Sequence, residues 1–140
     1  LCKGHNVSFT PSGVSMLPTI RPDRDIVTLS PLPEGMLRKY DLPLYRRDNG
    51  QYVLHRIVGV NGDGTYTCVG DNHIALEHGV RHDQMIAVVT LIERGKKKIP
   101  SDSWTYLMYC RFWHYTRFFR RVWRGLRRRV SKLLRIGSFR

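Results

Sequence analysis

A glycine-containing turn, Asn61-Gly62-Asp63-Gly64, separates two runs of β-branched and aromatic residues, 52–60 and 65–69. Two β-rich runs on either side of such a turn are the strongest short-range signal for a β-hairpin. Further β-rich runs, separated by turn residues, stand at residues 6–10, 25–29, 41–46 and 85–92. Pro43 marks its run as an edge strand or the site of a bulge. The pattern predicts a mainly β domain over residues 1–94, built as a small sandwich or barrel.

The chain changes in character after residue 94. Residues 95–103 contain three consecutive lysines and a proline, which predicts a linker. From Trp104 onward, apolar residues recur at three- and four-residue steps, the period of an α-helix. Residues 101–140 hold 11 basic and 1 acidic side chains, whereas residues 1–100 hold 13 and 10. The sequence therefore predicts a basic amphipathic α-helix in residues 104–140, attached to a nearly neutral β domain.

The composition of this helix indicates what it binds. Trp and Phe beside many arginines are typical of a helix that lies in an anionic membrane interface, where each basic residue contributes about 1 kcal/mol. We expect the membrane-binding residues to be Trp113, Phe119, Arg120, Arg121, Trp123, Arg124, Arg127 and Arg128. In the alternative, the apolar face packs on the β domain and the arginines are solvated. Nucleic acid is a less suitable partner, because phosphate binding does not need the bulky apolar residues.

The expected location is therefore the surface of a membrane, as a peripheral protein, with the cytoplasm as the alternative. No apolar run reaches the length of about 18 residues that a membrane-spanning helix needs. The sequence begins at Leu1 rather than Met, and it leaves open whether an anchor precedes this residue.

We expect no cofactor and no metal. The three cysteines, at positions 2, 68 and 110, are odd in number and far apart, which argues against a disulfide framework and a Cys-based zinc site. His73, His78 and His82 stand near Glu77, but their spacing is loose for a metal site.

Ser15 lies in a segment, residues 11–20, that is unusual for a plain loop. Gly13 permits a tight backbone path beside the serine, and Pro18 stiffens the exit from the turn. A serine at a rigid turn can present its own backbone N–H to an oxyanion, but as a weak nucleophile it needs a positioned base. The simpler interpretation is a serine at a junction between a strand and a turn.

His55 is the candidate base. It stands in the middle of a β-rich run, where alternation places it on one face with Val53 and Ile57. A neutral imidazole takes a hydroxyl proton near pH 7, although a histidine on an apolar face is more often a hydrogen-bonded core residue. Asp71 is a candidate to orient the imidazole, or else forms a local turn, and Glu77 is a second candidate acid.

Four motifs in one order carry a family resemblance: S-G-x-S-M-x-P-T-I, D-x-V, L-H-R-I-V-x-V and G-D-N, within residues 6–92. This order resembles the type-I signal peptidase and SOS-repressor peptidase superfamily. The resemblance implies a β-rich fold with Ser15 as nucleophile. Bacterial signal peptidases have a lysine where His55 stands, so the chain is similar to the branch that uses Ser and His. In that branch Asp71 is the first choice for the orienting acid and Glu77 the second.

The nucleophile loop supplies the other expected site residues. We assign Ser12, Gly13, Met16 and Pro18 to the oxyanion and substrate region. The family often has a hydroxyl side chain two residues before the nucleophile, whereas this chain has glycine there and Ser12 one position earlier. The oxyanion is therefore held by backbone N–H groups alone, or Ser12 reaches it. The family's Asp-rich stretch is also replaced here, by Leu-Glu-His around Glu77.

The resemblance implies a serine endopeptidase that cleaves a leader or signal segment from a peptide or protein. The expected substrate is extended and has small side chains before the cut. Acting at a membrane surface is the leading hypothesis. The alternatives are a soluble peptidase that matures a small peptide, and a catalytically inactive module that binds peptides at membranes. A self-cleaving regulator fits less well, because the sequence contains no DNA-binding domain.

Overall fold

The computed structural model describes residues 5–117, 119 and 122–123. The described part is mainly β, as predicted, with one α-helix, α1 (Trp104–Tyr115), and one short 3₁₀ helix, η1 (His82–Gln84). The strands are β1 (Val7–Phe9), β2 (Asp25–Ser30), β3 (Pro43–Arg46), β4 (Tyr52–Leu54), β5 (Arg56–Val60), β6 (Tyr66–Val69), β7 (Glu77–Val80), β8 (Met85–Arg94) and β9 (Lys97–Pro100).

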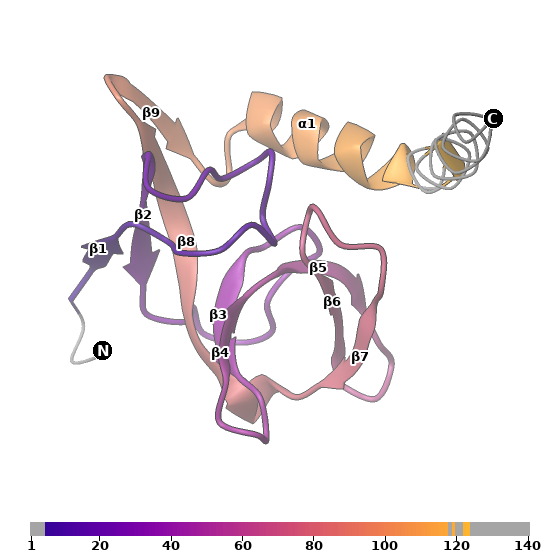
Figure 1. The fold of residues 1–140 in the computed structure, drawn as a ribbon. Helices are drawn as coiled ribbons and strands as arrows, with labels where there is room; N and C mark the ends of the chain where they lie inside the picture. The colour runs from indigo at the N-terminus through magenta and orange to yellow at the C-terminus, as the bar shows by residue number, and fades with distance from the viewer. Residues whose placement is uncertain (1–4, 118, 120–121, 124–140) are drawn as a thin grey trace, which may run out of the picture.

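The strands form two antiparallel sheets (Figure 1). The larger has the order β1-β2-β8-β3-β4, with β9 also paired to β8, and the smaller has the order β5-β6-β7. One cluster of buried apolar side chains includes Met16, Ile20 and Val89, and a second includes Tyr45 and Ile57. Strand β8 belongs to the larger sheet alone, but its side chains contribute to both clusters.

The predicted hairpin around Gly62 is confirmed. Strands β5 and β6 pair antiparallel with Val60 opposite Tyr66, and the backbone N–H of Asn61 donates to the carbonyl of Thr65 at 2.8 Å. Gly64 has a positive φ of 81°, the left-handed conformation that the tight turn requires and that glycine adopts without steric cost.

The run 52–60 was predicted as one continuous β-rich run, but it forms two strands. It is interrupted at His55, so β4 belongs to the larger sheet and β5 to the smaller one. The backbone of Ile57 exchanges hydrogen bonds with Tyr40 and Asp41, which draws β5 away from the β3–β4 pair. Residues 55–58 are all buried, so the predicted alternation fails because the chain here is covered on both sides. His55 therefore sits at the point where the chain passes between sheets.

Two further expectations for the β domain need correction. Strand β3 is not an edge strand, because it lies inside the larger sheet between β8 and β4. The other predicted possibility, a bulge near Pro43, agrees with a register shift between Leu44 and Tyr45 in its pairing with β8. Residues 95–103 are not a linker, because β9 pairs with β8 and Gly95 forms the tight turn between them with a φ of 58°. The lysines suit an edge strand, and Lys98 forms an ion pair with Glu93 across the hairpin at 3.3 Å.

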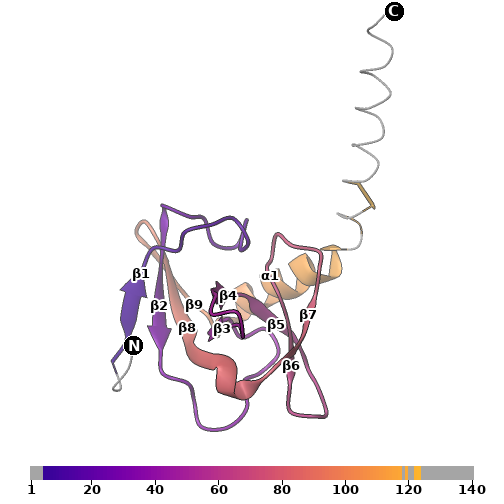
Figure 2. The ribbon, with the colours of Figure 1, turned by 60° about the horizontal axis from the view of Figure 1, so that its bottom comes forward.

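Helix α1 packs on the β domain with one face. Ser103 caps it by accepting a hydrogen bond from the backbone N–H of Tyr106, and Tyr106 and Cys110 are buried in the same cluster as Met16. The helix runs from beside β9 toward the loop before β7 (Figure 2). The predicted apolar face is not the packed one: Phe112, Tyr115, Phe119 and Val122 are exposed, so packing of that face on the β domain is not found at these positions. Residues 124–140 of the predicted helix lie outside the described residues.

Among the described residues, no helical segment combines the length and the hydropathy that crossing a membrane requires.

Candidate active site

The loop that carries Ser15 connects β1 to β2 and is held by Asn72. The backbone N–H of Asn72 donates to the carbonyl oxygen of Ser15 at 2.8 Å, and its side-chain Nδ2 donates to the carbonyl oxygen of Val14 at 3.1 Å. The loop is turned by Gly13, which has a φ of 99°. The predicted G-D-N motif therefore fixes the backbone on which Ser15 stands.

Ser15 and His55 line one cavity of about 250 Å³. Three of the residues expected around the oxyanion and substrate, Ser12, Gly13 and Met16, line it too, although Met16 is largely buried in the core. Pro18 does not: it lines a different cavity beside α1, because the chain turns away after Met16. The remaining wall comes from Pro11, Ile20, Arg47, Gln51, Tyr52, Val53, Leu54 and His73.

Gly70 shows how closely the Ser15 loop approaches His55. A Cβ atom at Gly70 would lie 2.7 Å from the carbonyl oxygen of Ser15, 3.0 Å from Nε2 of His55 and 3.1 Å from Nδ1 of His73. Only a residue without a side chain fits between these groups. Nε2 of His55 therefore faces the segment that carries the candidate nucleophile.

The other ring nitrogen of His55 faces Tyr45 and Glu77. The Tyr45 hydroxyl donates to Oε2 of Glu77 at 2.7 Å and lies 3.4 Å from Nδ1 of His55, while Nδ1 and Oε2 are 3.8 Å apart. A phenol has one proton, so a hydroxyl that donates to Glu77 can only accept from His55. The arrangement favours the tautomer with a proton on Nδ1 and a free lone pair on Nε2.

Tyr45 was missed by the sequence analysis. It is fully buried on β3, opposite Val53 of β4. The sequence shows only a tyrosine in a short β-rich run. That this run pairs with the strand leading to His55, which brings the two side chains together, is visible only in the folded chain. Burial raises the pKa of Tyr45, and the hydrogen bond to Glu77 adds to the effect, so the phenol keeps its proton.

Glu77 is held in place by Arg47. Nε and Nη2 of Arg47 donate to the two carboxylate oxygens at 2.7 and 2.6 Å. The Arg47 guanidinium holds the pKa of Glu77 below its usual value, so the carboxylate next to Tyr45 is charged near neutral pH. Arg47 was not among the predicted site residues.

Asp71, the first choice for the orienting acid, is instead bound to Arg56. Nε and Nη2 of Arg56 donate to its two carboxylate oxygens at 2.9 and 2.8 Å. Arg56 is only 1% exposed, and a buried guanidinium needs a counter-ion. Arg56 also donates to the carbonyl of Tyr40 and to the hydroxyl of Tyr106. The geometry therefore reverses the preferred order of the two acids: Glu77 lies at Nδ1 of His55, and Asp71 neutralises a buried cation.

His55 is uncharged at neutral pH in this environment. Burial lowers the pKa of His55 to about 4, and the nearby imidazole of His73 adds to this, while Glu77 opposes it. The two imidazole rings are 5.5 Å apart between centroids. A neutral imidazole with its lone pair on Nε2 is the form that accepts a proton from a hydroxyl.

We predict that the activity of this site persists to unusually low pH. His55 accepts a proton only while neutral, so kcat/KM should fall as pH drops through about 4, not through the ordinary histidine value near 6.5. The measurement is kcat/KM between about pH 3.5 and 8 for the reaction proposed below. His73→Gln removes the neighbouring imidazole and should move the midpoint upward. A midpoint near 6.5 in the wild type would contradict the assignment.

The residues predicted to bind a membrane lie in different environments. Trp113 points toward the β domain, where its Nε1 donates to the carbonyl of Asp71 at 2.8 Å, so it is a packing residue. Phe119 and Trp123 are exposed. The five arginines at positions 120, 121, 124, 127 and 128 lie outside the described residues.

Among residues 5–117, 119 and 122–123, no group of three His, Cys, Asp or Glu side chains is arranged to hold a metal ion.

No protein-family model, no curated protein and no solved structure matches the chain.

Proposed function

We propose that the protein is a serine endopeptidase of the signal-peptidase type, with Ser15 as nucleophile and His55 as general base. The observation that carries the proposal is the position of His55. One ring nitrogen faces the Ser15 segment in a shared cavity, and the other faces a buried Tyr45–Glu77 pair. A base between a nucleophile and an orienting acid is the arrangement that activates serine on unrelated folds.

The reaction proceeds by acyl transfer. Ser15 Oγ attacks the carbonyl carbon of the peptide while Nε2 of His55 takes the hydroxyl proton. The backbone N–H of Ser15 donates to the developing oxyanion, with the Ser12 hydroxyl as a further candidate donor. His55 then gives its proton to the leaving amine, and water hydrolyses the acyl-enzyme. The carboxylate of Glu77 stabilises the imidazolium through Tyr45.

Strand β4 is the proposed docking edge for the substrate. It ends the larger sheet, pairing with β3 alone among the described strands, and Tyr52, Val53 and Leu54 line the cavity with Ser15. An extended peptide added to this edge would bring its backbone past the nucleophile. The cavity of about 250 Å³ is small, which favours small side chains before the cut.

The outer face of α1 supports action at a membrane surface. Large side chains at four positions on one side of the helix are 42–74% exposed: Trp104, Met108, Phe112 and Tyr115, referred to below as the aromatic stripe. Trp and Tyr favour the boundary between water and lipid, and residues 101–140 carry a net charge of +10. An anionic bilayer complements both properties.

The relay through Tyr45 gives a prediction. Glu77→Gln or Tyr45→Phe is expected to lower kcat by about a hundredfold with little change in KM. Either substitution removes the group that keeps the proton of His55 on Nδ1, and neither residue contacts the substrate. Steady-state kinetics with one cleaved peptide measures both constants. Tyr66→Phe is the matched control: it removes the hydroxyl of another fully buried tyrosine, which bonds Leu37 and His82. Equal losses in Tyr45→Phe and Tyr66→Phe would refute the relay.

The proposed function is tested by covalent labelling. A fluorophosphonate reacts only with a serine that a neighbouring base activates, and peptide mass spectrometry locates the adduct. We expect the adduct on Ser15 in the wild type and none after His55→Ala. A parallel incubation with a mixed peptide library, with and without anionic vesicles, identifies the cut and its dependence on the membrane.

The second candidate is an inactive module that binds peptides at a membrane. It is favoured by one observation: Ser15 Oγ makes no hydrogen bond with His55 in the part of the chain that the structure describes. Such bonds are often long before substrate binds, which is why the peptidase remains the first proposal. Absence of any Ser15 adduct, together with retained peptide binding, would favour the module.

A further inference from the structure

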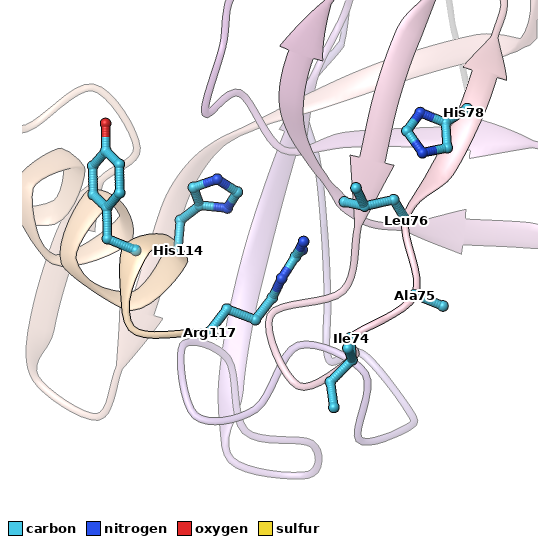
Figure 3. A pocket seen from close by; sticks show the side chains of 7 residues that line it. Ile74, Ala75, Leu76, His78, His114 and Arg117 are labelled. Carbon is cyan, nitrogen blue, oxygen red and sulfur yellow. The ribbon is translucent and has the colours of Figure 1, made fainter. Parts of the chain in front are cut away.

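A second and larger cavity, of about 780 Å³, lies at the C-terminal end of α1. Residues 74–76 form one wall and His114, Tyr115 and Arg117 lie on the other, with His78 also lining the space. Figure 3 shows the side chains of His114 and Arg117 extending from the end of the helix toward the cavity. The cavity shares no lining residue with the one that holds Ser15, so it is a separate site.

Arg117 brings a positive charge to this cavity without a counter-ion among the described residues. Its Nη1 atom is buried and makes no hydrogen bond there, and burial lowers the pKa of Arg117. The two acids closest in sequence to the cavity wall are occupied, since Asp71 binds Arg56 and Glu77 binds Arg47. A partly buried cation without an anion is unfavourable, so the cavity lacks a negative group.

No side chain of residues 116–140 can supply that group. The last acidic residue in the sequence is Asp102, and every charged side chain from residue 103 to 140 is basic. The missing anion must therefore come from another molecule or from an acid far away in the fold, and the described acids do not reach it.

The walls indicate that the anion carries an apolar part. Ile74, Ala75 and Leu76 offer hydrocarbon surface beside the guanidinium, which a free inorganic anion would leave unused. The aromatic stripe lies on the same helix, and its last residue, Tyr115, also lines the cavity. A stripe seated at the boundary of the acyl chains holds the cavity near the depth of the lipid headgroups, where the phosphates are.

We propose that this cavity binds the phosphate of an anionic phospholipid through Arg117. Residues 74–76 contact the glycerol and the first methylenes of the lipid, and the two imidazoles of His78 and His114 border the headgroup. The site goes beyond the proposed peptidase activity, because it uses none of the residues around Ser15.

The test uses the full chain and dihexanoyl phosphatidylglycerol, a short-chain lipid that is monomeric at low concentration. Calorimetric titration should show binding that Arg117→Gln weakens by about tenfold or more, the usual effect of losing a charge-assisted hydrogen bond. Arg111→Gln is the matched control. It removes the same charge from an exposed position on α1, where Arg111 lies over the ring of Tyr40, and should change affinity by about twofold at most.

The proposal would be overturned by no binding of the lipid, by equal weakening in both variants, or by displacement of the lipid by an equal concentration of inorganic phosphate. Vesicles of phosphatidylcholine should bind more weakly than vesicles that include phosphatidylglycerol, and the reverse order would also refute it. Arg117→Gln should keep the melting temperature of the wild type, which excludes loss of folding as the cause. Ser15→Ala should bind the lipid normally, so failure of this site and failure of the peptidase are told apart.

Discussion

Replacing Ser15 with alanine is expected to lower kcat/KM for a cleaved peptide by about ten-thousand-fold or more. The substitution removes the oxygen that forms the acyl-enzyme and leaves the rest of the cavity unchanged. The remaining rate would come from substrate binding and oxyanion stabilisation alone. The measurement is product formation by quantitative mass spectrometry, with the peptide that the wild type cuts best.

Two further variants make this result specific. Ser12→Ala removes a hydroxyl from the same cavity and should cost about a hundredfold at most, the effect of one oxyanion donor. His55→Ala should cost nearly as much as Ser15→Ala, and the double variant little more, because nucleophile and base act as one unit. A Ser15→Ala protein that still cleaves at the wild-type rate would remove Ser15 from the mechanism.

Asp71→Asn is expected to lower the free energy of unfolding by about 3–5 kcal/mol, because it leaves the buried guanidinium of Arg56 without a counter-ion. That is a large part of the stability of an ordinary domain, about 5–15 kcal/mol. Urea unfolding, followed by tryptophan fluorescence, gives the midpoint and slope from which the free energy is obtained.

Glu77→Gln is the matched comparison for Asp71→Asn. Its ion pair with Arg47 is about one-third exposed, so its loss should cost about 1 kcal/mol or less. The two acids should thus separate, with Asp71 affecting stability and Glu77 affecting kcat. If Asp71→Asn leaves stability unchanged and lowers kcat instead, Asp71 is the orienting acid and the assignment made from the geometry is wrong.

Local sequence signals predicted most of the strands. The turn at Gly62 and the β-rich runs predicted β6, β2 and β8 near their observed bounds, because hairpin turns and β-branched composition act over a few residues. The interruption at His55 was not predictable in this way. It depends on the pairing of Ile57 with residues 40–41, which are far away in sequence. Strand β9 was not predicted because three consecutive lysines have low β propensity. This segment forms a strand because it pairs with β8.

The same difference between local signals and distant contacts holds for the candidate site. Ser15 and His55 were named from their motifs, and the structure brings both to one cavity. Tyr45 was missed because a tyrosine in a β-rich run has no chemical meaning until its hydroxyl has a partner. Asp71 was preferred over Glu77 because it stands in the G-D-N motif that carries the family resemblance, and the sequence did not show that Arg56 is buried. A buried cation takes the nearest carboxylate, and only the folded chain shows which cation is buried.

The inner face of α1 has a consequence for how the chain can be divided. Trp113 donates to the carbonyl of Asp71, Tyr106 receives a hydrogen bond from Arg56, and Asn72, next to Asp71, holds the loop of Ser15. The helix is thus connected by hydrogen bonds to the segment that holds the Ser15 loop. The β domain and the helix are not interchangeable modules, and the shortest fragment that preserves the site must extend at least through Trp113. A molecule that binds the outer side of α1 therefore binds a helix whose inner side is hydrogen-bonded to Asp71 and Arg56, next to the segment that holds Ser15.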